Sequence, residues 1–462
     1  MKILYTTEQF YPLQTGLATA DYHFALSLTN LGHEVYVVTM DSFQNKRIER
    51  TGKKIILEEP FKKEAIEISP NLFVIEFDFR TTEYPIWCGE INNYRYFVQE
   101  FVCDLLIVSA FFTFTGDLLW ESVSELKATK KVLRSHGEST LANYLRLNQP
   151  TKPTKKQVFK DFIKNLLLSF GLTIKREPSF WHFTITNAPT TKEQKALDIT
   201  PYECYMPYLI FLLKRFLSCL DKVYFLHDKS HAIDFLTPLC KSVGILPNGV
   251  FQKDITPPKI ILASYCEMPH ALTRERERER ESKSLSALLE NPFVLNVSNY
   301  YKAKGQDFVL RAFYLSKCSI PLIFIGNFIE NNTLIELQAL KIKLDKKHGY
   351  KEVYFFEKIK RESVCLAFLK ATLFLHASTD EAFPMVILEC LQHATPYCCT
   401  DVGNVRNYLK ELLVNTEQEM GEKINALLSD SSYYESVSKK LHEIVKDYTY
   451  ESIAKEFLKE IE

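Results

Sequence analysis

The feature that most constrains this chain is an alternation of short apolar runs with segments of helical period, which occurs twice along the sequence. In the N-terminal half, Ile3–Thr6 and Glu34–Met40 are rich in β-branched and apolar residues, and Thr19–Leu31 between them has the spacing of a helix that ends at Gly32. Further strands are predicted at Leu105–Ala110, Lys131–Arg134, Phe183–Thr186 and Val223–Leu226. This order predicts a parallel sheet with helices on both faces.

A second series of apolar runs follows a charged, irregular stretch. Its predicted strands are Phe293–Val297, Leu322–Ile325, Val353–Phe356, Leu373–Leu375 and Tyr397–Thr400. Two such α/β series in 462 residues predict two Rossmann-like domains that face a central cleft, with ligands bound beyond the carboxyl ends of the strands. We expect domains at 1–255 and 256–440, and a C-terminal helix at 441–462 that packs back on the first domain.

Composition excludes several classes of protein. With 46% apolar and 25% charged residues, the chain has the composition of a globular protein. The 57 basic residues balance 57 acidic ones, so no overall field attracts nucleic acid, which we do not expect as a partner. The eleven cysteines form no C-x-x-C pair and lie mostly in apolar runs, which indicates reduced thiols in a cytosol rather than a disulfide framework or a zinc site.

The sequence indicates at most a peripheral contact with a membrane. The apolar run at the N-terminus is too short for a signal peptide. The longest uncharged apolar stretch, Leu105–Gly116, is shorter than the roughly 18 residues that span a bilayer. Gln149–Glu177 and Tyr202–Leu220 each fit either an interfacial helix on anionic lipid or an ordinary domain helix, and the second interpretation is favoured. We therefore expect a cytoplasmic protein, with any contact at the inner membrane being peripheral.

The run Arg274–Glu281 alternates arginine and glutamate near the predicted domain boundary. As protein, it fits an exposed helix with i,i+3 ion pairs or a solvated linker. As a coding sequence, it fits a purine dinucleotide tract that is prone to slippage, which leads to the hypothesis that expression is switchable. A constant codon count across many isolates would contradict this hypothesis.

Two glutamates in the second half are eight positions apart, with a proline between them. Pro384 suits the first turn of a helix, which places Glu381 in the preceding loop and Glu389 on the helix. The N–H groups and positive end of a helix N-terminus suit a diphosphate, and carboxylates accept hydrogen bonds from sugar and ribose hydroxyls. The same spacing also fits an acidic helix start with no ligand.

The stretch Asp380–Leu391 resembles the E-x7-E motif of family 4 and related retaining GT-B glycosyltransferases, the glycosyl transferases of group 1. The resemblance implies that Glu381 is a catalytic residue beside the donor sugar and that Glu389 binds the nucleotide ribose. It places four intervening residues in the donor-binding set, namely Phe383, Pro384, Met385 and Val386. Ala382 and Pro384 stand where the family usually has glycines, and Ala394 replaces the glycine of a later turn.

The segment that precedes the motif also resembles the family. Val294–Ser298 followed by Lys304 and Gly305 is similar to the strand and Lys-Gly segment that open the donor domain. The resemblance implies that Lys304 is catalytic and pairs with the diphosphate, because a lysine can follow the negative charge that develops on a leaving phosphate. Gly305 belongs to the expected donor site. So does Asn299, which occupies the position of the family's usual arginine; Lys302 is a candidate to compensate for that arginine.

Other elements resemble the family in the right order. Gly16 stands in the family's Gly-rich loop and is expected at the donor, as is the turn 400–404 after the last strand. Arg134–Gly137 resembles a His-Gly element, which implies that His136 is catalytic and reaches the donor sugar from across the cleft. Pro247–Val250 resembles the linker that closes the first domain, and Tyr448–Ile453 resembles the entry to the closing helix.

The sequence therefore predicts a retaining hexosyltransferase that moves a sugar from a nucleotide-sugar to a glycan or lipid-linked acceptor, in bacterial surface polysaccharide or lipopolysaccharide synthesis. The chain has no Asp-x-Asp, so we expect no metal and no cofactor. The residues do not identify the donor base, the donor sugar, the acceptor or the oligomeric state. One alternative is a non-catalytic, nucleotide-sugar-binding partner subunit of a glycosyltransferase complex, which Asn299 and the missing glycines suggest. Another is a sugar phosphorylase, although its pyridoxal-phosphate lysine motif is not apparent.

Overall fold

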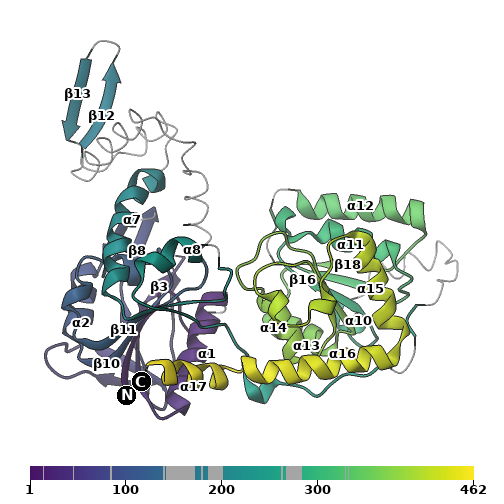
Figure 1. The fold of residues 1–462 in the computed structure, drawn as a ribbon, viewed down its shortest axis with the longest axis horizontal. Coiled ribbons are helices and arrows are strands. Elements are labelled where there is room, and N and C mark those ends of the chain that lie inside the picture. Colours follow the sequence, from purple (N-terminus) through teal and green to yellow (C-terminus); the bar gives the residue numbers. More distant parts are fainter. Residues whose placement is uncertain are drawn as a thin grey trace. The chain divides into compact units, whose positions relative to one another are not determined.

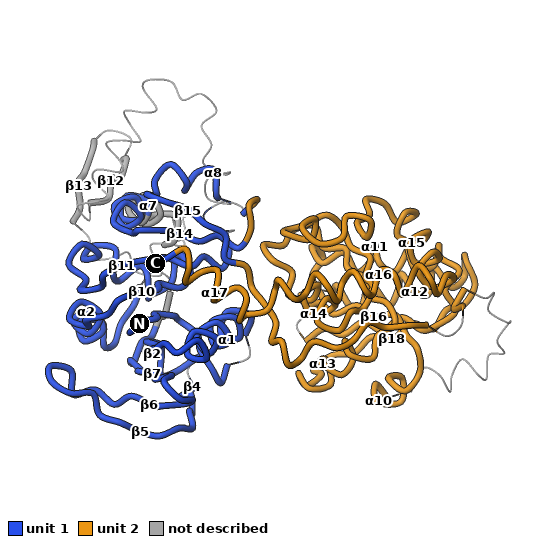
Figure 2. Tube along the Cα trace, turned by 60° about the horizontal axis from the view of Figure 1, so that its bottom comes forward, with its two compact units in different colours: residues 1–226, 230–246, 461–462 blue, residues 227–229, 247–460 orange. Residues whose placement is uncertain are grey.

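The structure is a computed structural model that describes six stretches of the chain. They are residues 1–138 except 14, 45, 84 and 85, residue 141, residues 172–177 and 180–185, residues 201–266 except 231, 262 and 263, and residues 284–461 except 328 and 331. The chain divides into two compact units (Figure 2), unit 1 of residues 1–226, 230–246 and 461–462, and unit 2 of residues 227–229 and 247–460. Each unit is an α/β structure built around a sheet (Figure 1).

Unit 1 contains, within its described residues, a nine-stranded sheet in the order β15-β14-β11-β10-β1-β2-β7-β6-β5. The strands are β1 (Lys2–Thr6), β2 (Glu34–Met40), β5 (Lys53–Ile56), β6 (Glu64–Ser69), β7 (Leu72–Phe77), β10 (Cys103–Ser109), β11 (Ala128–Arg134), β14 (Lys222–Phe225) and β15 (Val243–Ile245). Neighbours from β15 to β7 pair in parallel, whereas β6 pairs antiparallel with both β7 and β5. Ile3, Leu4 and Tyr5 of β1 are all buried, as expected for a central parallel strand covered on both faces.

Short helices and hairpins surround this sheet. The helices are α1 (Gly16–Asn30), α2 (Ile91–Glu100), α3 (Phe114–Asp117), η1 (Val123–Glu125), α7 (Pro201–Cys219), α8 (Ile233–Leu236) and η2 (Thr237–Leu239). Three pairs of strands lie outside it, β3 (Ser42–Phe43) with β4 (Lys46–Arg47), β8 (Phe79–Glu83) with β9 (Ile86–Gly89), and β12 (Leu172–Glu177) with β13 (Phe180–Ile185). The predicted stop of α1 is confirmed: Leu31 caps the helix, and Gly32 follows with a φ of 88°.

One strand prediction in this half is wrong. Phe183–Thr186 was expected in the parallel sheet, but β13 pairs antiparallel with β12 in a separate two-stranded sheet. An apolar run of this length fits a hairpin strand as well as a buried strand, and periodicity does not distinguish them. Residues 149–171 and the Arg-Glu run 274–281 lie outside the described residues.

The segment Tyr202–Leu220 forms most of α7. This helix buries Leu213, Phe216 and Leu217 in the hydrophobic core of unit 1. In the part of the chain that the structure describes, no helix is both long enough and apolar enough to cross a membrane.

Unit 2 contains, among its described residues, a five-stranded parallel sheet in the order β18-β17-β16-β19-β20. Its strands are β16 (Val294–Val297), β17 (Leu322–Ile325), β18 (Val353–Phe356), β19 (Leu373–His376) and β20 (Tyr397–Cys399). All five coincide with predicted strands, which are therefore confirmed. The central strand β16 buries Val294 and Leu295 completely, and the carboxyl ends of β16, β19 and β20 meet at one edge of the sheet.

Helices separate the strands of unit 2 and follow the last one. They are η3 (Gln252–Asp254), α10 (Leu285–Leu288), η4 (Lys302–Lys304), α11 (Gln306–Leu315), α12 (Thr333–His348), α13 (Arg361–Lys370), α14 (Met385–Gln392), η5 (Val405–Asn407), η6 (Lys410–Leu412), α15 (Glu417–Ser429), α16 (Ser431–Ile444), η7 (Val445–Tyr448) and α17 (Tyr450–Ile461). The two ends of the unit are tied together. The Val250 N–H donates to the Tyr448 carbonyl at 2.9 Å, and the Tyr450 N–H donates to the Val250 carbonyl at 2.9 Å.

Candidate functional site

Two loops at the carboxyl edge of the unit 2 sheet fit together through a glycine. Gly305, between η4 and α11, has a φ of 63°, and a Cβ atom built there would lie 2.0 Å from the Ala377 carbonyl oxygen. No other residue type fits this approach. The Thr379 N–H also donates to the Ala303 carbonyl at 2.9 Å, so the loop after β16 is joined to the loop after β19.

This junction places a lysine against a glutamate. Lys304 Nζ lies 2.5 Å from Glu381 Oε1, and the two side chains are only 25% and 16% exposed. The buried His376, at the end of β19, has its Nε2 3.5 Å from the same oxygen. Burial by itself would raise the pKa of Glu381, but the nearby His376 ring and the charge of Lys304 lower it to about 2. The glutamate is therefore an ionised acceptor, held beside a cation.

The second glutamate of the motif lies on the helix, as predicted. Pro384 has a φ of −69° and precedes the first residue of α14, so Glu381 is in the loop before the helix and Glu389 is on it. Glu389 pairs with Arg361 at the start of α13, and its side chain is 14% exposed. Burial raises the pKa of Glu389, and the charge of Arg361 opposes that rise.

The loop between the glutamates is supported by the turn that follows β20. Gly403 has a φ of 55°, and a Cβ atom there would lie 2.8 Å from the Ala382 carbonyl and 3.1 Å from Pro384 Cδ. Phe383 is buried beside this contact, whereas Met385 and Val386 in the first turn of α14 are partly exposed. The turn 400–404 thus lies against the Glu381 loop and the N-terminus of α14.

Asn299 and Lys302 occupy different positions from Lys304. The Asn299 carbonyl accepts hydrogen bonds from Gln306 Nε2 at 2.8 Å and from the Tyr301 N–H at 2.8 Å, which fixes the chain after β16. Lys302 lines a cavity of about 530 Å³ together with Asp307, Arg311 and Glu417. Gly305, Ala377, Thr379 and Thr400, from the loops of the site, also line this cavity. Lys304 does not line this cavity, so the two lysines of η4 face different surroundings.

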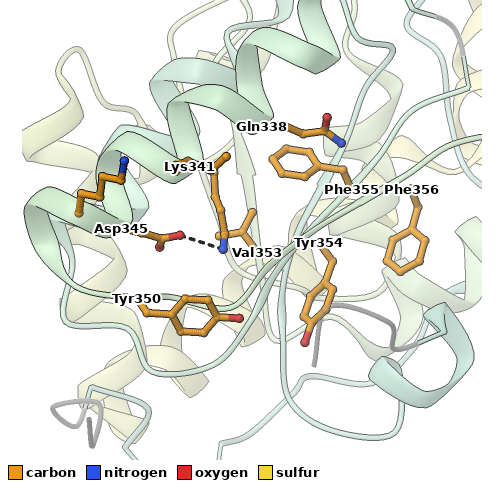
Figure 3. A pocket seen from close by; sticks show the side chains of 10 residues that line it. Gln338, Lys341, Asp345, Tyr350, Val353, Tyr354, Phe355 and Phe356 are labelled. Carbon is orange, nitrogen blue, oxygen red and sulfur yellow. Dashed lines mark ion pairs between the residues drawn. The ribbon is translucent and has the colours of Figure 1, made fainter. Parts of the chain in front are cut away.

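A larger cavity of about 670 Å³ lies between α12 and the edge strand β18 (Figure 3). Its lining consists of Gln338, Lys341, Ile342, Asp345, Lys346, Tyr350, Val353, Tyr354, Phe355 and Phe356. Lys341 Nζ pairs with Asp345 Oδ2 at 2.9 Å inside it and lies 4.4 Å from the centre of the Tyr350 ring. None of the residues that the sequence analysis singled out lines this cavity.

The two site residues predicted in the N-terminal half lie in unit 1. Gly16 begins α1, and a Cβ atom there would meet nothing within 4 Å, so unit 1 alone does not require a glycine. His136 follows β11, and its Nε2 lies 2.8 Å from Oδ1 of the buried Asp21 on α1. Among the described residues, no group of three His, Cys, Asp or Glu side chains is arranged to hold a metal ion.

Residues 277–447 match the family of glycosyl transferases group 1. The match covers just over a third of the chain. No curated protein matches it significantly over its sequence.

Solved structures show that this chain has the GT-B fold. Sucrose-phosphate synthase from Thermosynechococcus elongatus is similar with a TM-score of 0.59 and 14% identity, over 99% of this chain and 97% of that one. HepE of Anabaena, solved with UDP and glucose, has a TM-score of 0.56 and 13% identity, over 100% and 99%. WaaG, a glycosyltransferase involved in lipopolysaccharide biosynthesis, has a TM-score of 0.50 and 15% identity, over 99% of both chains.

Unit 2 brings most of the predicted site residues to one edge of its sheet. Lys304 and Glu381 are in contact, Gly305 joins their loops, and the segment 383–386 forms the start of α14 beside them. Glu389 lies farther along the same helix and pairs with Arg361.

Three charged or titratable residues at these places were not predicted. Arg361 and His376 had no signal, because each is an ordinary residue at the end of a predicted element. Asp21 had one: it lies in the apolar stripe of α1, between the buried Ala18 and Phe24. An acidic residue on the buried face of a helix requires partners, and this signal could have been noticed.

Proposed function

We propose that this protein is a retaining glycosyltransferase that transfers a hexose-type sugar from a nucleotide-sugar donor to a glycan or lipid-linked acceptor. The observation that carries the proposal is the contact of Lys304 with Glu381 beside the N-terminus of α14. These groups place a cation, the positive end of a helix and an ionised carboxylate within one site. Such a site has the charges that a sugar diphosphate requires.

Each residue has a chemical role in this proposal. Lys304 and the first-turn N–H groups of α14 stabilise the negative charge that develops on the departing diphosphate. Glu381 accepts hydrogen bonds from hydroxyls of the donor sugar, and Glu389 accepts them from the ribose. Because protein groups supply the positive charge, the proposed reaction needs no metal ion and no cofactor.

Retention follows from attack on the same face as the leaving group. The departing phosphate oxygen takes the proton of the acceptor hydroxyl, while the acceptor oxygen forms the new glycosidic bond. No protein nucleophile is required in this scheme. His136 in unit 1 is proposed to bind the donor sugar, and Gly16 and Asn299 remain proposed donor contacts.

The setting of the reaction is also a proposal. HepE was solved with UDP and glucose, and WaaG is involved in lipopolysaccharide biosynthesis, so a uridine diphosphate sugar and a bacterial surface glycan are our first candidates for donor and product. We propose a cytoplasmic enzyme with peripheral contact at the inner membrane, where a lipid-linked acceptor is presented.

The test compares purified wild type with Glu389→Ala on UDP-, GDP- and ADP-sugars, with and without EDTA. Loss of charged hydrogen bonds to the ribose is expected to lower kcat/KM by about 10- to 100-fold. The control is Glu422→Ala, which removes an exposed glutamate of α15. EDTA-resistant release of one nucleotide by wild type and by the control would support the enzyme.

The alternative is a nucleotide-sugar-binding partner subunit without catalysis. Asn299, in place of an arginine, motivates it. Binding of a nucleotide with no turnover, across a broad panel of acceptors, would favour this alternative and contradict the proposed enzyme.

A further inference from the structure

The carboxylate of Asp21 accepts hydrogen bonds from several side chains near the carboxyl edge of the unit 1 sheet. Asp21 is completely buried on α1. Five side chains donate hydrogen bonds to it, Tyr5 Oη at 2.6 Å, Thr7 Oγ1 at 2.6 Å, Ser109 Oγ at 2.6 Å, Arg134 Nη1 at 3.1 Å and His136 Nε2 at 2.8 Å. The donors come from the ends of β1, β10 and β11 or from residues just after them, the edge at which parallel α/β sheets bind ligands.

The five bonds divide between the two oxygens of Asp21. Oδ1 contacts Tyr5, Arg134 and His136, whereas Oδ2 contacts Thr7 and Ser109. Although burial by itself would raise the pKa of Asp21, His136, Arg134 and the Ser109 hydroxyl hold it well below its ordinary value. The carboxylate is therefore ionised and can only accept, so the hydrogen in the contact with His136 lies on Nε2.

This contact determines which ring nitrogen is left to act on a ligand. In a neutral imidazole, one nitrogen donates and the other accepts, and the partner of one fixes the role of the other. With Nε2 donating to Asp21, Nδ1 of His136 is an acceptor. The His136 side chain is 11% exposed, at the end of β11.

We propose that Asp21 is a positioning residue, which fixes His136 in the tautomer whose Nδ1 accepts a hydrogen bond from a hydroxyl of the substrate sugar. This inference rests on the proposed function and adds a requirement to it. The sugar must carry a free hydroxyl at the position that His136 reaches. A site built to accept a hydroxyl hydrogen discriminates strongly against a deoxy sugar, because the acceptor is then left unpaired.

A purely structural role for the ion pair predicts something different. Replacing a buried ion pair with apolar residues of similar volume is often neutral for stability or even stabilising, so a fold alone does not need this network. The paired replacement Asp21→Val with Arg134→Met removes both charges together and leaves no unpaired one. This variant therefore tests whether the ion pair stabilises the fold or positions His136.

The first experiment is a cycle of variants measured by donor turnover and by thermal unfolding. The paired replacement is expected to lower the melting temperature, because the buried hydroxyls of Tyr5, Thr7 and Ser109 lose their acceptor. At a temperature at which the variant remains folded, it is expected to lower kcat by about 10- to 100-fold, the effect that losing the partner of a metal-binding histidine has in other proteins. Adding His136→Ala to it should cause no further loss, because Asp21 acts through His136. The control is Glu58→Ala, at an exposed position of unit 1, which should stay within about three-fold of wild type.

Two kinetic outcomes would overturn the proposal. If the losses from the paired replacement and from His136→Ala multiply, Asp21 acts independently of His136. If the paired replacement leaves kcat unchanged, the network supports the fold alone.

A second measurement does not depend on turnover. Nitrogen-15 NMR of histidine-labelled full-length protein, with the His136 signals assigned by their loss in His136→Ala, reports the tautomer directly. We expect hydrogen on Nε2 in wild type; hydrogen on Nδ1 would refute the proposal even in an active enzyme, and even where the paired variant does not fold. A wild type without turnover on any donor would instead refute the proposed function, and the tautomer would still decide the role of Asp21.

Discussion

At the scale of single residues, Lys304 does two things at once. It neutralises Glu381 at 2.5 Å, and it presents a mobile cation next to the start of α14. Its neighbour Lys302 has the same charge and lies in the same short helix, but it lines a cavity whose lining includes neither Lys304 nor Glu381. The two lysines therefore form a matched pair of positions, of which only one belongs to the proposed site.

We predict that Lys304→Ala lowers kcat/KM by about 10²- to 10³-fold, as expected when one group that stabilises transition-state charge is removed. Lys302→Ala is the matched control and should remain within about three-fold of wild type, as is usual for a surface substitution. Steady-state kinetics with the best donor measure both variants. Equal losses of kcat/KM in the two variants would contradict the assignment of Lys304 alone. They would support Lys302 as the cation that compensates for the arginine missing at position 299.

Glu8 follows β1 in unit 1, and burial raises its pKa from 4.5 to about 7. A raised folded-state pKa means that folding favours the protonated carboxyl. The stabilisation is complete below about pH 4.5 and is lost as the pH rises through about 7. Above that range, ionised Glu8 destabilises the folded protein.

We predict that the free energy of unfolding of Glu8→Gln, relative to that of wild type, rises by about 2–3 kcal/mol from pH 5 to pH 8, because glutamine keeps the shape of the side chain and does not titrate. Urea unfolding at the two pH values measures the difference. Glu58→Gln, at an exposed position of the same unit, should show a difference from wild type that does not change with pH. A pH-independent difference for Glu8→Gln would show that this carboxyl is solvated.

At the scale of elements, the site depends on how closely three loops approach one another. Gly305 lies against Ala377, and Gly403 lies against Ala382, each with a positive φ and a backbone neighbour closer than a Cβ atom allows. The loops after β16, β19 and β20 therefore form one rigid assembly. Lys304 and Glu381 meet because of this backbone contact and not only because their charges attract.

We predict that Gly305→Ala lowers the free energy of unfolding by about 2–4 kcal/mol, since it combines an unfavourable φ with a steric overlap. Gly32→Ala is the matched control: its φ of 88° is also positive, but a Cβ atom there would meet nothing within 4 Å. The unfavourable φ alone should lower the free energy of unfolding of Gly32→Ala by about 1–2 kcal/mol. Urea unfolding compares the two variants, and equal losses would mean that the loops can separate without cost.

The sequence predicted regular elements better than special contacts. All five strands of unit 2 were predicted, because buried parallel strands are continuous apolar runs. The hairpin at 172–185 was missed, because pairing direction is a property of the partner strand and leaves no mark on periodicity. For the site, the E-x7-E spacing located Glu381 and Glu389 in the sequence. Nothing in that spacing indicated their neighbours in the structure, since His376 lies beside Glu381 and Arg361 pairs with Glu389.

At the scale of the whole molecule, the proposal places the ribose and the diphosphate of the donor against unit 2. A ligand at about 100 times its Kd stabilises the form that binds it by about 2.7 kcal/mol. In the full-length protein, that stabilisation should be concentrated where the ligand contacts the chain.

We predict that hydrogen exchange with UDP present slows in segments 298–306 and 380–389 of unit 2. The cavity between α12 and β18 should be unaffected (Figure 3). Glu389→Ala is the control and should show little protection at the same concentration. Protection centred on Lys341 and Tyr350 would instead identify that cavity as the nucleotide site.

The hydrogen bonds between Val250 and residues 448–450 have a consequence for how such proteins diversify. Because the chain enters unit 2 and approaches its last helix at adjacent positions, the intervening segment begins and ends at nearly the same point in space. A segment with adjoining ends can be exchanged between related genes as one cassette, and the flanking chain keeps its path. Recombination at these two points would replace donor specificity in a single event and preserve whatever acceptor the rest of the protein recognises.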